Sequence, residues 1–189
     1  MRKAVFLDKD GTVVHNFPYN VDPSKIELTA GCAEALLRLH QAGHPLIVIS
    51  NQPGLAKGLF SLQDLQRAER FLARLLASFG IPIRAFYYFP HHPEAVVPRS
   101  RTACTCRKPA PGLIEQAARE HGLDLAGSWM IGDILNDVEA GRRAGCGTIL
   151  IDNGNETEWV RSPIRTPDYV VPGLIEAAEI ICRSNTPRE

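Results

Sequence analysis

The ten residues 3–12, KAVFLDKDGT, decide the fold, because they join a short apolar run to a cluster of polar residues. The run 3–7 (KAVFL) has the length and composition of a buried strand. It ends at Asp8, and a second carboxylate follows at Asp10. Residues two positions apart in an extended chain lie on the same side. We therefore expect both carboxylates to face one way, just beyond the end of the strand.

Short apolar runs alternate with helical patterns along the rest of the chain. Ser61 and Asp64 form a capping-box pattern at the start of the longest helix. Further strands are expected at 46–49, 83–88, 128–131, 148–151 and 168–171, and helices at 31–41, 61–79, 111–122, 135–144 and 173–182. This alternation predicts an α/β fold, with a doubly wound, mostly parallel sheet and helices on both faces. We expect a single domain over 1–189, with 153–167 as a surface excursion.

The composition narrows the class of protein. The chain has 189 residues with 21 Lys and Arg against 21 Asp and Glu, so its formal net charge is zero. This balance argues against nucleic-acid and membrane-surface partners. No apolar run approaches the roughly 18 residues of a membrane span, and the N-terminal run is too short for a secretory signal. Five scattered cysteines make a poor disulfide framework. These features predict a cytoplasmic protein.

Polar residues follow three of the predicted strands, at the sheet edge where such folds bind ligands. Asp8 and Asp10 follow the first strand, Ser50 and Asn51 the second, and Asp133 the fourth. Three neighbouring carboxylates repel one another unless a cation holds them, and magnesium prefers such oxygen ligands. The hydroxyl and amide donors suit the oxygens of a phosphoryl group. A carboxylate nucleophile beside a metal indicates phosphoryl transfer.

Four further residues are candidates for the same site. Lys108 closes a long loop and suits a phosphoryl oxygen, and Arg107 beside it is a second cation for an anionic substrate. Asp137 is either functional or an exposed acid favoured by the dipole of its helix. Thr12, which follows the two acids of the first motif, is the fourth candidate. Thr12 and Val13 stand where a calcium loop has an acid or Asn and then Gly, so that loop is excluded.

These groups resemble, in order, the four motifs of the haloacid-dehalogenase-like phosphohydrolases. The matching residues are Asp8-Lys9-Asp10-Gly11-Thr12, Ser50-Asn51, Lys108 and Gly132-Asp133-x-x-x-Asp137, which span nearly the whole chain. The resemblance implies that Asp8 is the nucleophile and forms an aspartyl phosphate, while Asp10 acts as general acid and then base. It also implies magnesium held by Asp8, Asp133 and the carbonyl of Asp10. The segments between the motifs leave room for loops above the site, but not for a cap domain.

A closer resemblance lies in the loop at 89–108. The segments YYFPHHP (87–93) and CTCRKP (104–109) look like the zinc loop that D,D-heptose 1,7-bisphosphate 7-phosphatases share with histidinol-phosphate phosphatases. Phe89 stands where that family has its first cysteine, so three of the four zinc ligands remain: His91, Cys104 and Cys106. A closed structural zinc site has four protein ligands. The resemblance implies a zinc site with three protein ligands, and the alternative is that Cys104 and Cys106 are ordinary thiols.

This closer resemblance implies the substrate. We expect a magnesium-dependent phosphatase that removes the 7-phosphate of a heptose 1,7-bisphosphate, in the pathway to lipopolysaccharide core or nucleotide-activated heptose. Histidinol phosphate is the alternative substrate. A phosphate-binding scaffold without turnover is the alternative from another class of protein. The expected partner is a small phosphorylated sugar, and the expected state is a monomer.

Overall fold

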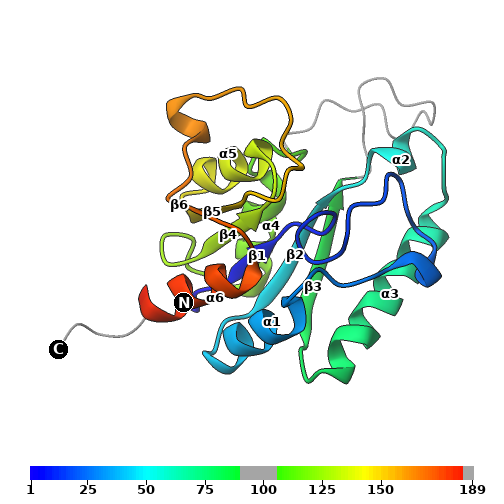
Figure 1. Ribbon diagram of the computed structural model, residues 1–189, viewed down its shortest axis with the longest axis horizontal. Coiled ribbons are helices and arrows are strands. Elements are labelled where there is room, and N and C mark those ends of the chain that lie inside the picture. Colours follow the sequence, from blue (N-terminus) through cyan, green and yellow to red (C-terminus); the bar gives the residue numbers. More distant parts are fainter. Residues whose placement is uncertain (90–105, 185–189) are drawn as a thin grey trace.

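The computed structural model describes residues 1–89 and 106–184, and its centre is a six-stranded parallel sheet (Figure 1). The strand order is β3-β2-β1-β4-β5-β6, and every adjacent pair is parallel. The strands are β1 (Val5–Leu7), β2 (Leu46–Asn51), β3 (Ile83–Phe89), β4 (Trp129–Gly132), β5 (Gly147–Ile151) and β6 (Tyr169–Val171). The expected doubly wound α/β fold is confirmed.

Helices cover both faces of this sheet. They are α1 (Cys32–Gln41), α2 (Pro53–Ala56), α3 (Leu62–Ser78), α4 (Gly112–His121), α5 (Leu135–Arg143) and α6 (Leu174–Ser184). Side chains of α1, α3 and α6 belong to one hydrophobic cluster, and those of α4 and α5 to a second. The sequence did not predict α2, because its four residues are too few to show a helical period.

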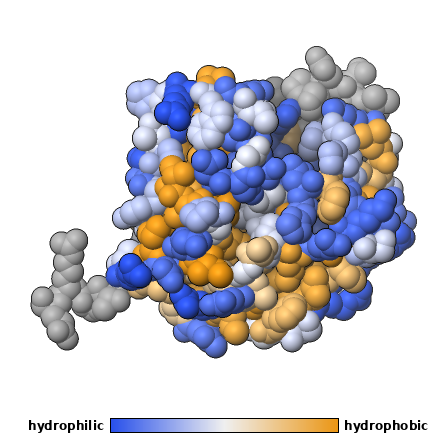
Figure 2. Space-filling view, viewed as in Figure 1, coloured by the Kyte–Doolittle hydropathy of each residue, from blue (hydrophilic) through white to orange (hydrophobic). Residues whose placement is uncertain are grey.

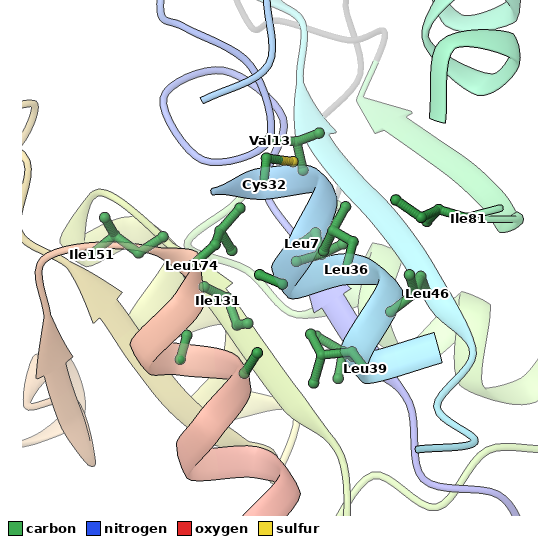
Figure 3. Packing of buried hydrophobic residues seen from close by; sticks show 14 of the residues in the cluster. Leu7, Val13, Cys32, Leu36, Leu39, Leu46, Ile81, Ile131, Ile151 and Leu174 are labelled. Atoms are coloured by element: carbon green, nitrogen blue, oxygen red, sulfur yellow. The ribbon is translucent and has the colours of Figure 1, made fainter. Parts of the chain in front are cut away.

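The larger cluster lies between α1 and the middle of the sheet (Figure 3). Leu36 and Leu39, three residues apart on α1, are fully buried and pack over Leu7 of β1 and Leu46 of β2. A central strand that is buried on both faces does not alternate between apolar and polar residues. This is why a continuous apolar run, rather than an alternating one, marked β1 in the sequence.

The capping box at the start of α3 is confirmed. The backbone N–H of Asp64 donates to the hydroxyl of Ser61 at 3.2 Å, and the Asp64 carboxylate accepts from the Ser61 N–H at 3.0 Å. These two bonds satisfy amides that the first turn of a helix leaves without partners. The long helix that follows connects β2 to the edge strand β3.

The strand order reverses beside β1. The chain passes from β1 to β2 and β3 on one side, then crosses back to β4 on the other side of β1. Loops leaving β1 and β4 therefore diverge at their carboxyl ends and open a crevice, the usual ligand position in such sheets. The fold thus brings the residues after β1 and after β4 to one place.

Part of the surface beside the C-terminal helix is hydrophobic. Figure 2 shows a hydrophobic patch over β6 and α6. Tyr169 and Val170 of the edge strand β6 are exposed. Among the described helices, none is both long enough and apolar enough to cross a membrane.

Candidate active site

Three buried carboxylates meet where β1 and β4 end. Asp8 follows β1, Asp133 follows β4, and Asp137 lies in the first turn of α5. One oxygen from each lies within 4.8 Å of the others. The Asp8 N–H donates to the Ile131 carbonyl at 2.9 Å, which extends the contact between the two strands to the site itself. Parallel pairing of β1 and β4 therefore fixes the spacing of the acids.

Lys108 is the cation among these carboxylates. Its ammonium is paired with Asp8 and with Asp137, the latter at 2.6 Å, and it donates to the Ile49 carbonyl at 2.9 Å. Only 2% of the lysine is exposed. Asp137 is fully buried, so its interpretation as an exposed first-turn acid is wrong. The sequence underrated Asp137 because its partner, Lys108, lies far away along the chain.

Burial and charge shift the pKa values of these groups. Burial raises the pKa of Asp8 well above its usual range; Lys108 opposes this shift, and Asp137 and Asp133 add to it. Burial would lower the pKa of Lys108, but Asp137 and Asp8 outweigh burial and raise that pKa. Burial and Asp137 raise the pKa of Asp133 to about 6, against a hydrogen bond from Asn155. The carboxylates therefore resist ionisation without a cation beside them.

Asp10 lies on the same cleft but is not in the group of three acids. Its carboxylate accepts from the Gln52 amide at 3.1 Å and is paired with Lys9. Gln52 also donates to the Ser50 hydroxyl at 2.8 Å. The side chain of Gln52 therefore connects the second motif to Asp10, a role that the sequence did not indicate.

Asn51 orients Lys108 in this structure. Its side-chain amide donates to the Lys108 carbonyl, and its side-chain oxygen accepts from the Lys108 N–H, both at 3.1 Å. These two bonds, to the N–H and to the carbonyl of the same residue, fix the backbone from which the lysine extends. Asn51 also lines the cleft, whereas the Ser50 side chain is buried against Gln52.

The cleft above the carboxylates has a volume of about 350 Å³. One wall is the segment 16–20, in which the ring of Tyr19 is half-exposed. Lys57, which follows α2, donates to the Tyr19 hydroxyl at 2.8 Å and so holds this wall. The cleft is lined by Asp8, Asp10, Asn16, Phe17, Pro18, Tyr19, Asn20, Asn51, Gln52, Pro53, Lys108, Asp133 and Ile134.

Two glycines make room for the acids. A Cβ at Gly132 would overlap the side chain of Asp137, and a Cβ at Gly11 would overlap Asp133 and Asn155. Gly11 also has a φ of 93°, which other residues rarely adopt. Both motif glycines are thus required by close packing around the carboxylates.

Several residues that the sequence predicted for the site do not line the cleft in the part of the chain that the structure describes. Thr12 is buried and its hydroxyl donates to Asp133 at a long 3.4 Å. Arg107 is half-buried and does not line the cleft as the described residues shape it. His91 and Cys104 lie outside the described residues. Cys106 and Phe89 pack with one hydrophobic cluster, in which Phe89 is 3% exposed.

The segment 153–167 lies mostly at the surface, as expected, but two of its side chains also bond to the site. The Asn155 amide donates to Asp133 at 2.7 Å, and the Asn153 amide donates to the Gly11 carbonyl at 2.7 Å. The polar residues of this segment therefore include both side chains that face solvent and two that bond to the site. The polarity of a sequence does not distinguish side chains that bond to a site from side chains that face water.

The donor set fits magnesium. Asp8, Asp133 and Asp137 offer three carboxylate oxygens within one small volume, and hard cations such as magnesium prefer oxygen ligands. Burial raises the pKa of Asp8 and of Asp133, and Asp137 adds to both shifts, so a cation bound between these carboxylates would favour their ionised forms. A divalent cation would supply that positive charge.

Comparisons with known proteins agree with this chemistry. The HAD-hydrolase-like family model matches residues 105–177. The chain is 36% identical to D-glycero-beta-D-manno-heptose-1,7-bisphosphate 7-phosphatase of Photorhabdus laumondii, over 80% of this chain and 81% of the relative. It is 34% identical to the alpha-anomer phosphatase of the same organism, over 82% and 85% of the two chains.

A solved structure is similar over nearly its whole length. The D,D-heptose 1,7-bisphosphate phosphatase of B. bronchiseptica, crystallised with magnesium and phosphate, is 31% identical. The match covers 96% of this chain and 99% of that chain, with a TM-score of 0.78.

Replacing the buried lysine should make stability strongly dependent on pH. In Lys108→Met, Asp8 and Asp137 lose their cation, and breaking a buried pair costs about 3–5 kcal/mol when the remaining charges stay ionised. The pKa of Asp8 is already raised, so folding favours its protonated form. The free energy of unfolding of the variant should therefore fall as the pH rises from 5 to 8. Urea unfolding of metal-free protein measures this, with the exposed Lys25→Met as control. An equal loss at both pH values would contradict the prediction.

Proposed function

Because the chain belongs to the heptose 1,7-bisphosphate 7-phosphatase family of HAD-like hydrolases, we propose that it removes the 7-phosphate of D-glycero-D-manno-heptose 1,7-bisphosphate. The observation that carries this proposal is the group of three buried carboxylates around Lys108, open to a cleft at the strand reversal. This arrangement provides a nucleophile, a site for a cation and a lysine in one volume.

Asp8 is the proposed nucleophile. Its carboxylate attacks phosphorus in line, and the bond to the sugar oxygen breaks, which leaves an aspartyl phosphate. Lys108 beside Asp8 supports the ionised form that attack requires, against the burial that disfavours it. Water then hydrolyses the aspartyl phosphate and restores the carboxylate.

Asp10 is the proposed general acid and base. It gives a proton to the leaving sugar oxygen and later takes one from the attacking water. Gln52 and Lys9 contact its carboxylate and orient it toward the cleft that both Asp8 and Asp10 line. Two carboxylates with different partners thus have different roles.

Magnesium, bound by Asp8, Asp133 and the Asp10 carbonyl, would offset the negative charge of nucleophile and phosphate. Asp137 contributes through Lys108, which it holds at 2.6 Å. Lys108 and the Asn51 amide are proposed to stabilise the transferring oxygens, which is the main demand of phosphoryl transfer. Ser50, whose side chain is buried, would contribute through Gln52.

The proposed substrate carries a second phosphate, and Arg107 is the group proposed to bind it. Arg107 directly precedes Lys108, and a guanidinium matches phosphate oxygens well. Histidinol phosphate is the alternative substrate. Relatives named for either anomer of the heptose match at 36% and 34% identity, so both anomers belong in the test.

We also propose a place in the cell and an oligomeric state. Cys32 and Cys146 are buried thiols outside any disulfide, although Cys106 is disulfide-bonded in the structure, and thiols of this kind are usual in a reducing compartment. A monomeric, single-domain enzyme in the cytoplasm, acting in heptose synthesis for lipopolysaccharide, fits these thiols and the zero net charge. Chromatography with light scattering measures the oligomeric state directly.

The structure has Cys106 in a disulfide. With this cysteine reduced, the zinc loop is proposed to bind zinc through His91, Cys104 and Cys106, with water or His92 as the fourth ligand. With three family ligands instead of four, zinc should dissociate more readily than from a closed site. Phe89, at the missing position, is buried in the core cluster that Cys106 also contacts.

Substitution of the two aspartates should separate their roles. Asp8→Asn should abolish phosphate release from every ester, since no nucleophile remains. Asp10→Asn should slow a sugar phosphate by about 100-fold or more but an aryl phosphate much less, since an aryl leaving group needs no proton. Phosphate release from both esters measures this. Turnover near the wild-type rate in Asp8→Asn would refute the mechanism.

A substrate panel tests the proposed specificity. The wild type should prefer the heptose 1,7-bisphosphate over histidinol phosphate and simple sugar monophosphates. Arg107→Ala should lower kcat/KM for the bisphosphate by about tenfold or more, equivalent to about 1.4 kcal/mol, and leave monophosphates nearly unchanged. Preference for histidinol phosphate would establish the alternative substrate. Equal losses on all esters would contradict a second-phosphate role for Arg107.

Phe89→Cys tests the zinc proposal. The variant gains the missing ligand but loses a buried ring, so without zinc its melting temperature should fall below that of the wild type. With zinc it should recover, and it should retain the metal better during dialysis against a chelator. The measurement is the zinc content of the wild type and of Phe89→Cys after this dialysis. Zinc absent from both, or held equally firmly by both, would contradict the three-ligand site.

A further inference from the structure

Asp133 receives its best hydrogen bond from outside the four motifs. The Asn155 amide donates to Asp133 Oδ2 at 2.7 Å, whereas the Thr12 hydroxyl is 3.4 Å from Oδ1. Asn155 is half-buried and lies in the loop that follows β5. Within the described residues, the amide of Asn155 is thus the stronger side-chain restraint on this carboxylate.

The loop that carries Asn155 is anchored to both halves of the site. On one side, the Asn153 amide donates to the Gly11 carbonyl at 2.7 Å. On the other, the Glu156 carboxylate accepts from the Leu135 N–H at 2.7 Å, in the first turn of α5. Asn155 stands between these two anchors. Its amide is therefore presented to Asp133 by a segment that contacts both diverging loops.

A second connection fixes the far end of this loop. Arg165 donates to the buried carboxylate of Glu139 at 2.7 Å and to the Asn136 side chain at 3.0 Å, both on α5. Glu139 also accepts from Arg143. The loop is thus attached to α5, the helix whose first turn supplies Asp137.

Close packing leaves little freedom around this bond. A Cβ at Gly11 would overlap both Asp133 and Asn155, so the first motif, the carboxylate and the amide are in mutual contact. An amide that donates to one carboxylate oxygen restricts rotation of the carboxylate and adds no charge. Partners of this kind orient the ligands of metal sites and raise metal affinity.

We propose that Asn155 is a positioning residue for Asp133 as a magnesium ligand, presented by the anchored loop 153–156. The inference rests on the magnesium site of the proposed function and deepens it. Asn155 does not touch the reacting atoms. Its contribution is to hold one carboxylate in the orientation that binds the cation.

The test measures metal affinity apart from catalysis. Binding of Mn²⁺, a paramagnetic substitute for magnesium, is followed by electron paramagnetic resonance on the full chain. Asn155→Ala should weaken binding by about tenfold, the lower end of the effect of such partners on metal affinity. Its kcat at saturating magnesium should stay near the wild-type value, while the magnesium concentration for half-maximal rate rises by a similar factor. Asn155→Gln, which keeps the donor, should recover part of the affinity.

Asn153→Ala is the matched control, since it removes an amide of the same loop that bonds to Gly11 instead of Asp133. It should lower the melting temperature of the metal-free protein but change Mn²⁺ affinity by less than about threefold. Equal losses of affinity in both variants, or an unchanged affinity in Asn155→Ala, would overturn the role of Asn155. A wild type that binds no Mn²⁺ would instead overturn the magnesium site itself, and the inference with it.

Discussion

The ion pairs of one buried lysine hold the site together. Lys108 lies among Asp8 and Asp137 with 2% of its surface exposed, and its contacts join β1, β2 and α5. Burying charges is expensive unless each one has a partner, and removal of one partner leaves the rest uncompensated. The geometry of the surrounding elements follows from this constraint. Position 132 must be glycine because the side chain of Asp137 lies against the end of β4, where a Cβ would overlap it. Asp137 reaches Lys108 from this place.

The strand reversal makes this cluster possible. Asp8 and Asp133 are far apart in sequence, yet β1 and β4 are neighbours, and the chains that leave them diverge. Their carboxylates therefore meet in a crevice instead of being covered by the next connection. Because the sheet sets the positions of the acids, the loops of the cleft wall can differ without moving them. Substrate preference in this fold can thus change independently of the phosphoryl chemistry.

Much of this arrangement could be predicted from the sequence, for identifiable reasons. The strands and the long helices were found because their patterns are local: buried apolar runs, helical periods and the capping box of Ser61. Asp8, Asp10 and Asp133 were found because each directly follows such a strand. What the sequence missed depends on contacts between distant segments. The sequence named Asp137 as a candidate but could not show its burial against Lys108, and it gave no role to Asn155, which bonds to Asp133. α2 is too short to show a period.

Three residues whose orienting roles the sequence did not indicate share a chemical property. Asn51 holds the backbone of Lys108, Gln52 holds the carboxylate of Asp10, and Asn155 holds that of Asp133. Each is a neutral amide that orients one charged group. A charged residue in the same place would alter the balance between the acids and the lysine, and with it the pKa values on which the site depends. Amides fix direction without changing charge, so the charge pattern of a sequence gives no sign of them. In this site, the acids and the lysine carry the charge. The amide side chains orient these charged groups, and their contacts with them form only in the folded structure.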